Sequence, residues 1–307
     1  MPGLMLLDTP SLYYRAFYGI PESVTAPDGT PVNAVRGLID MIAMLVRQHS
    51  PGELAACMDA DWRPAFRVAA IPSYKEHRLA PDGGEETPDT LAPQVPVIER
   101  VLDAAGIARL GVPGYEADDV MGTLALRPRG AADGGVDVVT GDRDMFQLVD
   151  DTVPIRILYT ARGVKNLQLV DEAAVTERYG VPGRAYADFA VLRGDPSDGL
   201  PGVAGVGEKT AATLITRFGS LDALLKALDG DGDLTRAQRS RLEAARDYLR
   251  VAPEVVRVAH DAPVPDVTLA LPQEPRDPRA LTELAGRHGI GGPLGRLAQA
   301  LSWSWRA

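Results

Sequence analysis

The chain has 307 residues, with 32 basic and 42 acidic side chains and a formal net charge of −10. Its content of 45% hydrophobic and 24% charged residues is close to globular averages, which excludes wholesale disorder. The single cysteine, Cys57, excludes a disulfide framework and a cysteine-based zinc site, and four histidines leave little room for a histidine-rich metal centre. The N-terminal apolar run is short and lacks a basic flank, so we expect a cytoplasmic protein without a membrane span.

The first half of the chain alternates short apolar runs with amphipathic stretches. Strands are predicted at Leu4–Leu7, Leu54–Met58, Ala108–Leu110, Val136–Thr140 and Val153–Leu158. Helices are predicted at Ala34–His49, Leu91–Ala105, Ala117–Leu126 and Asp144–Leu148. This alternation predicts an α/β fold with a mostly parallel central sheet.

Residues 61–93 interrupt that alternation, because they contain no strand candidate and many prolines. Their first half is basic and aromatic, whereas the second half, PDGGEETPD, is acidic and glycine-rich and is expected to be mobile. A segment of this length without sheet structure inside a compact domain is usually functional or disordered.

From about Glu172 the pattern changes to short helices separated by glycine and proline. They are predicted at Glu172–Tyr179, Arg184–Arg193, Glu208–Arg217, Leu221–Leu228 and Thr235–Arg250. We therefore divide the chain into an α/β region at 1–170 and a helical region with its C-terminal tail at 171–307. Trp303 and Trp305 in the tail are expected to pack against the protein; a sliding-clamp peptide at Gln299–Trp303 is the weaker interpretation.

Nine carboxylates occur at the ends of predicted strands or in the loops that follow. They are Asp8, Asp59, Glu116, Asp118, Asp119, Asp142, Asp144, Asp195 and Asp198. Ligands of open parallel sheets bind at the carboxyl ends of the strands, so these acids are expected to converge. Any single aspartate could instead cap a helix or a turn, although Thr9 followed by Pro10 is the better cap at the first helix.

A converged set of carboxylates without cations would repel strongly in a partly desolvated cleft. Oxygen-only ligation suits Mg²⁺ or Mn²⁺, and two such ions are typical of phosphoryl chemistry. The acids therefore predict a two-metal site.

The segment GVAGVGEKTA, Gly202 to Ala211, opens a predicted helix. It does not fit the Walker A pattern, because Glu208 separates Gly207 from Lys209. A helix–hairpin–helix turn that grips a phosphate with backbone N–H groups fits better, and a plain glycine-rich turn is the alternative.

Together these segments resemble the structure-specific 5′ nucleases: the bacterial 5′→3′ exonucleases, the N-terminal nuclease domain of bacterial DNA polymerase I and, more distantly, the flap endonucleases. The resemblance rests on LLDTPSLYYRAFY, MDADWRPAFR, IPSYKEHR, GYEADDVMGTLA, TGDRDMFQLV and GDPSDGLPGVAGVGEKTA, in the order of the family. It implies a PIN-like nuclease core, a helical arch at about 61–93 beside which the 5′ strand passes, and a C-terminal helix–hairpin–helix region.

The resemblance also implies a role for each matching position. Asp8, Asp59, Glu116 and Asp118 correspond to the first metal cluster, and the other five acids to ligands of the neighbouring metal, directly or through water. Arg15 and Lys75 correspond to the basic catalytic pair. Tyr74 is expected to stack on a base and Arg78 to contact a phosphate. Gly202, Gly205, Gly207, Lys209 and Thr210 would bind the duplex, and the hairpin would hold a K⁺ ion.

The implied activity is 5′→3′ exonuclease and 5′-flap endonuclease cleavage with two or more Mg²⁺ or Mn²⁺ ions. The implied partner is branched or 5′-flapped DNA, with RNA-primed ends as an option, and the expected protein is a monomer associated with the nucleoid. Two alternatives differ in class: a PIN-like ribonuclease, which lacks the hairpin and the arch, and a DNA-binding module with a degenerate site, which would not retain the complete acid set.

Overall fold

A six-stranded sheet forms the centre of the molecule in the computed structural model, which describes residues 3–129, 134–230 and 232–305. The strands follow the order β3-β2-β1-β4-β5-β6, and all neighbours are parallel except the antiparallel pair β5 and β6. Their bounds are β1 Leu4–Asp8, β2 Glu53–Cys57, β3 Ala108–Leu110, β4 Val136–Thr140, β5 Ile155–Tyr159 and β6 Gln168–Val170. The predicted α/β fold with a mostly parallel sheet is confirmed; β6 was missed.

Helices cover both faces of the sheet, so its central strands are buried on both sides. In β1, Met5 and Leu7 point into one apolar core and Leu4 and Leu6 into the other. The first core is shared with α1 (Thr9–Gly19), α2 (Asn33–His49) and α4 (Val95–Ala105), and the second with α5 (Ala117–Ala125) and α7 (Tyr186–Arg193).

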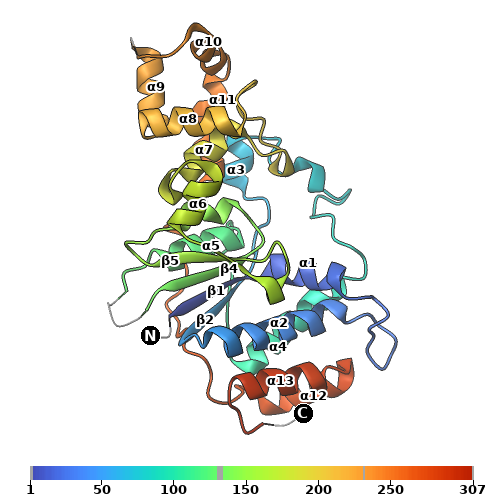
Figure 1. Ribbon diagram of the computed structural model, residues 1–307. Coiled ribbons are helices and arrows are strands. Elements are labelled where there is room, and N and C mark those ends of the chain that lie inside the picture. The colour runs from blue at the N-terminus through green and yellow to red at the C-terminus, as the bar shows by residue number, and fades with distance from the viewer. Residues whose placement is uncertain (1–2, 130–133, 231, 306–307) are drawn as a thin grey trace.

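The helical region stands at one end of the sheet (Figure 1). It contains α6 (Glu172–Tyr179), α8 (Glu208–Phe218), α9 (Leu221–Asp229), α10 (Arg236–Ala244) and α11 (Arg246–Val256). The last two replace the single helix predicted at Thr235–Arg250, because the backbone leaves helical geometry at Ala245. Short 3₁₀ turns lie at η3 (Asp144–Leu148), η4 (Val164–Asn166), η5 (Gly183–Ala185) and η6 (Pro196–Asp198).

The segment 61–93 contains no strand, as predicted, but it is more ordered than expected. It forms α3 (Ala65–Ala70), η1 (Glu76–Arg78) and η2 (Ala92–Gln94), and Figure 1 shows its cyan trace leaving the helical region and returning beside α1. The acidic tip is a tight hairpin in which Leu79 pairs with Glu85, and the Ala80 amide donates to the Gly84 carbonyl at 2.8 Å.

The C-terminal tail follows the helical region in the sequence but packs against the α/β region. Helices α12 (Pro278–His288) and α13 (Gly291–Ala300) pack against α4 and α2 at the opposite end of the molecule (Figure 1). Trp303 is buried and donates from its indole N–H to the Pro272 carbonyl at 2.7 Å, which confirms its packing role. None of the helices within the described ranges is both long and apolar enough to cross a membrane.

The docking of the tail predicts a stability effect at Leu294, which is fully buried on α13 against α2. Leu294→Ala should lower the free energy of unfolding by about 2–5 kcal/mol, measured by urea denaturation, because it leaves a cavity. The adjacent Gly295→Ala is the control: the added methyl meets open space, so stability should be unchanged or rise by up to about 1 kcal/mol. Equal stability of Leu294→Ala and the wild type would contradict the docking.

Candidate active site

The carboxyl ends of β1, β2 and β4 open onto a cleft of about 320 Å³. Six of the nine predicted carboxylates line it: Asp8, Asp59, Glu116, Asp118, Asp142 and Asp195. They come from segments spread over almost 190 positions of the chain, and the parallel sheet brings them together because its strands all end at the same edge. Asp119, Asp144 and Asp198 do not line the cleft.

Asp8 ends β1 and also caps α1, since its carboxylate accepts from the Ser11 amide at 3.1 Å. The cap predicted at Thr9 is therefore wrong, and Thr9 and Pro10 occupy the first helical positions. The Thr140 hydroxyl donates to the other oxygen of Asp8 at 2.5 Å, which ties the end of β1 to the end of β4. Burial raises the pKa of Asp8 to about 7, although both hydrogen bonds oppose this.

Glu116 and Asp118 begin α5, and Asp59 is linked to them through the Ala117 amide, which donates to its carboxylate at 2.8 Å. Glu116 is buried, and desolvation raises its pKa to about 7 even though Lys75 and Arg67 pull it down. The pKa of Asp118 is also raised, first by desolvation and then by repulsion from Asp142 and Asp8. These acids therefore sit in a cleft where negative charge is poorly compensated.

The TGDRD segment turns sharply after β4. The Asp142 carboxylate accepts from the Asp144 amide at 2.8 Å, while the Asp142 amide donates to the Thr140 hydroxyl at 2.9 Å. Asp144 follows Asp142 closely but does not line the cleft, and one of its carboxylate oxygens is buried without a hydrogen-bond partner. Burial and repulsion from Asp142 raise the pKa of Asp144. A buried, unpartnered carboxylate oxygen is what a cation would satisfy.

Asp195 and Asp198 approach from the loop that follows α7. Asp195 caps η6 by accepting from the Ser197 amide at 2.9 Å. Asp198 is turned toward the arch, where Arg78 donates to it at 2.8 Å. The Asp198 carbonyl also accepts from the Lys75 amide at 3.1 Å, so this loop and the arch are joined at the edge of the cleft.

Lys75 and Arg78 bring positive charge from the arch into the acidic cleft. The Lys75 ammonium donates to Glu116 at 2.7 Å, and its backbone adopts a left-handed φ of 48° that residues other than glycine rarely take. Such strain at a charged cleft residue is typical of functional positions. The predicted basic residue Lys75 is thus placed among the acids.

Asp119 points away from the cleft and is fully buried. Its carboxylate accepts from Arg67 at 2.6 and 2.8 Å and from the Ala259 amide at 2.8 Å. Asp119 therefore faces Arg67 and does not line the cleft, whereas a direct metal ligand would have to face the cleft. Arg67 also donates to Glu116 at 3.0 Å, so the pair supports a cleft residue from behind.

Tyr74 is also placed differently from the prediction. Its ring is 3% exposed and cannot stack on a base, and its hydroxyl donates toward both oxygens of Glu116 at 3.0 Å. The aromatic side chain that does reach the cleft is Tyr14 on α1, which is half-buried. The sequence had offered no reason to prefer it over Tyr13 or Tyr18.

Arg15 lines a neighbouring groove of about 890 Å³ between α1, α2 and residues 162–166, and this groove shares Ser11 and Tyr14 with the acidic cleft. The Arg15 Nε atom is buried without a partner. Lys75 and Arg15 are therefore not side by side in one cleft, and the structure does not bring the expected basic pair together.

The predicted hairpin joins η6 to α8, and two of its three glycines, Gly202 and Gly205, are required by the backbone. A Cβ atom at Gly202 (φ 64°) would lie 2.6 Å from the Gly194 nitrogen, so this glycine serves backbone packing. Gly205 (φ 75°) lies against Arg241, which donates to its carbonyl at 3.0 Å. Gly207 caps α8 and faces open space, with Lys209 exposed and Thr210 half-buried in the following turn. This end of the hairpin, where α8 begins, is open to a phosphate.

Comparisons with known proteins agree with this geometry. The model of the 5′-3′ exonuclease N-terminal resolvase-like domain matches residues 3–180, and that of the 5′-3′ exonuclease C-terminal SAM fold matches residues 181–278. A 5′-3′ exonuclease of Streptomyces coelicolor is 62% identical over 97% of this chain and all of its own length. The chain belongs to the 5′→3′ exonuclease family. DNA polymerase I of Mycobacterium bovis is 43% identical over 90% of the chain, which spans only 29% of that protein.

A solved structure shows the same fold at low sequence identity. The bacteriophage T5 flap endonuclease, in a complex with DNA and metal ions, superimposes with a TM-score of 0.63 at 16% identity, covering 98% of this chain and 97% of the phage protein. As a member of this exonuclease family, the chain is a phosphodiester hydrolase, and the predicted family and enzyme class are confirmed.

The residues of this exonuclease fit divalent cations by their chemistry. The possible metal ligands of the cleft are all oxygen atoms, and the Asp144 carboxylate near Asp142 has a buried oxygen without a partner. Within the described ranges, no group of three or more His, Cys, Asp or Glu side chains is tight enough to enclose a metal ion by itself. Water and substrate oxygens would therefore complete the coordination, as is usual for Mg²⁺.

Two residues have roles that were not predicted from the sequence. Arg67 is the bulkiest fully buried side chain and holds Glu116, Asp119 and the Val255 carbonyl. The sequence feature that could have indicated its burial is the position of this arginine within the apolar stretch AFRVAA. Glu85, in the acidic tip, lines the cleft itself, and only the fold of the arch places it there.

The raised carboxyl pKa values predict how stability depends on pH without divalent cations. Asp8 and Glu116 have a pKa of about 7 in the folded protein and near 4 in the unfolded chain. Their contribution to stability is therefore complete below about pH 4, where both states are protonated, and is lost as the pH rises through about 7. In EDTA, the melting temperature should fall between pH 5 and pH 8.

Asp118→Asn should counteract that loss, because it removes one of the repelling charges. It should raise the free energy of unfolding at pH 8 in EDTA by about 1–3 kcal/mol, with little effect at pH 5. Glu283→Gln on the exposed surface of α12 is the control and should change neither value. A wild-type protein that is equally stable at both pH values would contradict the repulsion.

Tyr74→Phe distinguishes stacking from positioning. Phenylalanine would preserve stacking, so a stacking role predicts unchanged cleavage. Removing the hydroxyl takes one of three donors from Glu116 and leaves Lys75 and Arg67 to hold its carboxylate, and a lost hydrogen bond to a charged group costs about 1–3 kcal/mol. We expect single-turnover cleavage to fall about tenfold with unchanged DNA affinity; wild-type cleavage would refute the positioning role.

Proposed function

We propose that the chain is a divalent-metal-dependent 5′→3′ exonuclease and 5′-flap endonuclease that acts on branched or 5′-ended DNA during replication and repair. The observation that carries this proposal is the convergence of six carboxylates with Lys75 and Arg78 in one cleft at the edge of the sheet. The T5 relative supports it, because that nuclease was crystallised with DNA and metal ions.

Two clusters would hold Mg²⁺ or Mn²⁺. Asp8, Asp59, Glu116 and Asp118 would bind one ion, and Asp142, Asp144 and Asp195 the neighbouring ion. Asp198 would act through water, because Arg78 already holds its carboxylate. When bound, such ions polarise the phosphoryl group and make water nucleophilic at neutral pH.

The side chains of the chain orient the phosphate and offset its charge. Lys75 is anchored by Glu116 and would place its ammonium against a phosphoryl oxygen, where negative charge grows during cleavage. Arg78 lines the same cleft, and Arg15 would contact a phosphate in the adjoining groove. No histidine lines the cleft, so proton transfer would pass to solvent or substrate oxygens.

Duplex binding is assigned to the hairpin before α8. The open N-terminus of this helix at Gly207, together with Lys209, would hold a backbone phosphate independently of base sequence. Arg241 already satisfies the Gly205 carbonyl, so the proposed K⁺ ion would use other carbonyls of the turn.

The remaining assignments follow the same reasoning. Exposed large apolar residues such as Tyr18, Leu126 and Val153 are dispersed over different elements, which supports a monomer. A cytoplasmic, nucleoid-associated enzyme acting on DNA or RNA-primed 5′ ends fits the proposed substrate.

Both alternative functions are disfavoured. The hairpin argues against a PIN-like ribonuclease, and the six carboxylates that line the cleft argue against a DNA-binding module with a degenerate site.

Asp142→Ala tests the proposed function. Single-turnover cleavage of a 5′-flap DNA in Mg²⁺ should fall by at least about a thousandfold, because an emptied metal site loses stabilisation of the transition state. Binding of the same DNA should persist, and Glu283→Ala on α12 should cleave like the wild type. Cleavage by Asp142→Ala within tenfold of wild type, or wild-type cleavage in EDTA, would overturn the metal assignment.

A further inference from the structure

The acidic tip of the arch, the hairpin at residues 79–86, forms part of the cleft wall through Glu85. Its hairpin is closed by the Glu86 amide, which donates to the Arg78 carbonyl at 2.7 Å, and by the pairing of Leu79 with Glu85. The Tyr14 and Thr87 hydroxyls lie 3.3 Å apart, within hydrogen-bond distance, and so hold the hairpin against α1. Glu85 is thereby fixed beside the six carboxylates.

The Glu85 carboxylate adds negative charge that is not paired in a salt bridge, although Lys75 and Arg78 lie near enough to attract it. Lys75 pairs with Glu116, and Arg78 pairs with Asp198. Across the described ranges, no salt bridge or hydrogen bond reaches the Glu85 carboxylate, although Glu85 lines the same cleft as both cations. Its charge therefore remains available to act on a substrate phosphate.

A charge count shows the consequence. The cleft is lined by seven carboxyl groups, including Glu85, and by three basic side chains, Lys75, Arg78 and Arg143; when every carboxyl is ionised, as bound cations would favour, this leaves an excess of four negative charges. Two divalent cations would cancel that excess. Without Glu85 the same cleft would carry one net positive charge, which would attract a polyanion.

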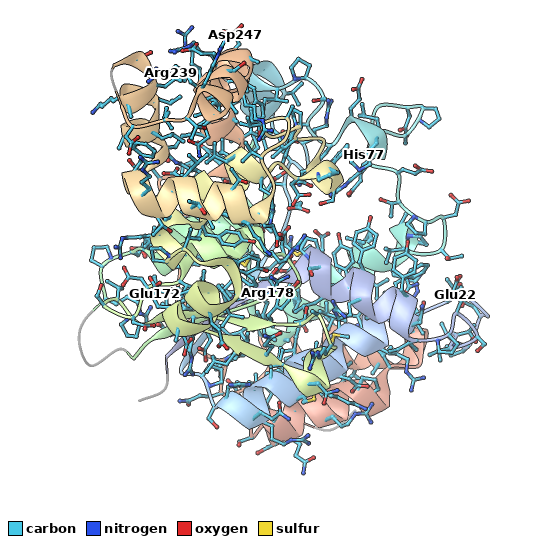
Figure 2. The ribbon with its side chains drawn as sticks, turned by 45° about the horizontal axis from the view of Figure 1, so that its top comes forward. Glu22, His77, Glu172, Arg178, Arg239 and Asp247 are labelled. Atoms are coloured by element: carbon cyan, nitrogen blue, oxygen red, sulfur yellow. The ribbon has the colours of Figure 1, made fainter. Side chains whose placement is uncertain are left out.

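A second groove leads outward from the cleft between α1 and the hairpin. It has a volume of about 350 Å³ and is lined by Tyr14, Tyr18, His77, Arg78, Glu85 and Glu86. Tyr14, Arg78 and Glu85 belong to both spaces, so a strand leaving the cleft on this side must carry its phosphates past two carboxylates. Figure 2 shows His77 projecting from the arch beside this region.

We propose that Glu85 and Glu86 are specificity-determining residues that favour short 5′ ends over long single-stranded 5′ flaps. The proposal rests on the proposed nuclease function. A 5′ end at a nick reaches the scissile position without entering the outer groove, whereas a long flap brings additional phosphates beside like charges. This repulsion weakens with salt, because it acts through partly exposed groups.

The test compares a nicked duplex with a 5′ flap of about 20 nucleotides. We expect Glu85→Gln with Glu86→Gln to raise the ratio of kcat/KM on the flap to kcat/KM on the nick by about three- to tenfold at low salt, with most of the gain lost at high salt. Asp89→Asn removes the same charge from an exposed arch position outside both spaces and should leave the ratio unchanged.

Several results would overturn the proposal. They are an unchanged ratio, an equal change on both substrates, or a gain that is independent of salt. A weaker affinity for Mn²⁺, measured by calorimetry without DNA, would instead make Glu85 a metal ligand and would also overturn it.

A binding measurement separates this proposal from the proposed function. In an Asp142→Ala background, the two Gln substitutions should increase the affinity for a duplex with a 5′ single-stranded tail but not for a blunt duplex, measured by fluorescence anisotropy. This preference would stand even if the protein cleaved neither substrate. Equal affinities would refute the role of Glu85 and Glu86.

Discussion

Repulsion among carboxylates is the constraint on which the rest of this structure depends. Asp8, Glu116 and Asp118 all have raised pKa values because they are desolvated, and Asp8 and Asp118 lie near other acids. Such a cluster costs stability in every state without cations, so the surrounding fold must supply the compensating free energy. It does so through a sheet whose strands are buried on both faces, and through helices whose first turns hold the acids by hydrogen bonds to backbone amides.

Buried arginine is the second means of tolerating this charge. Arg67 neutralises Asp119 and Glu116 behind the cleft and also donates to the Val255 carbonyl at the end of α11. One side chain therefore ties the base of the arch, the start of α5 and the helical region together. Breaking such a network at one partner is costly, because the remaining charges stay buried and unpaired. Gln147 makes a similar link on the other side, where it donates to the Val256 carbonyl and accepts from the Val258 amide.

Much of the fold and of the acid set could be predicted because both depend on local patterns. Apolar runs gave the strands, and acids placed directly after them had to meet at one edge of a parallel sheet. The errors concern long-range contacts. Nothing local distinguishes Asp118, which faces the cleft, from Asp119, which faces Arg67, because the rotation of α5 decides this. Likewise, the burial of Tyr74 depends on its contact with Glu116, and the position of the tail depends on its packing against α2 and α4. These partners are far away in the chain, so the local sequence does not reveal them.

The way charge is distributed over the folded protein makes a net charge of −10 compatible with a DNA substrate. Nucleic acid responds to the local field, and much of the negative charge here is confined to one small cleft where divalent cations can offset it. The basic side chains at its edge are held in place by those acids: Lys75 by Glu116 and Arg78 by Asp198. A phosphate that enters the cleft would therefore meet basic side chains that are already held in place, and less conformational entropy is lost on binding than with free side chains. The acids thus prepare the cleft for the anion that they would otherwise repel.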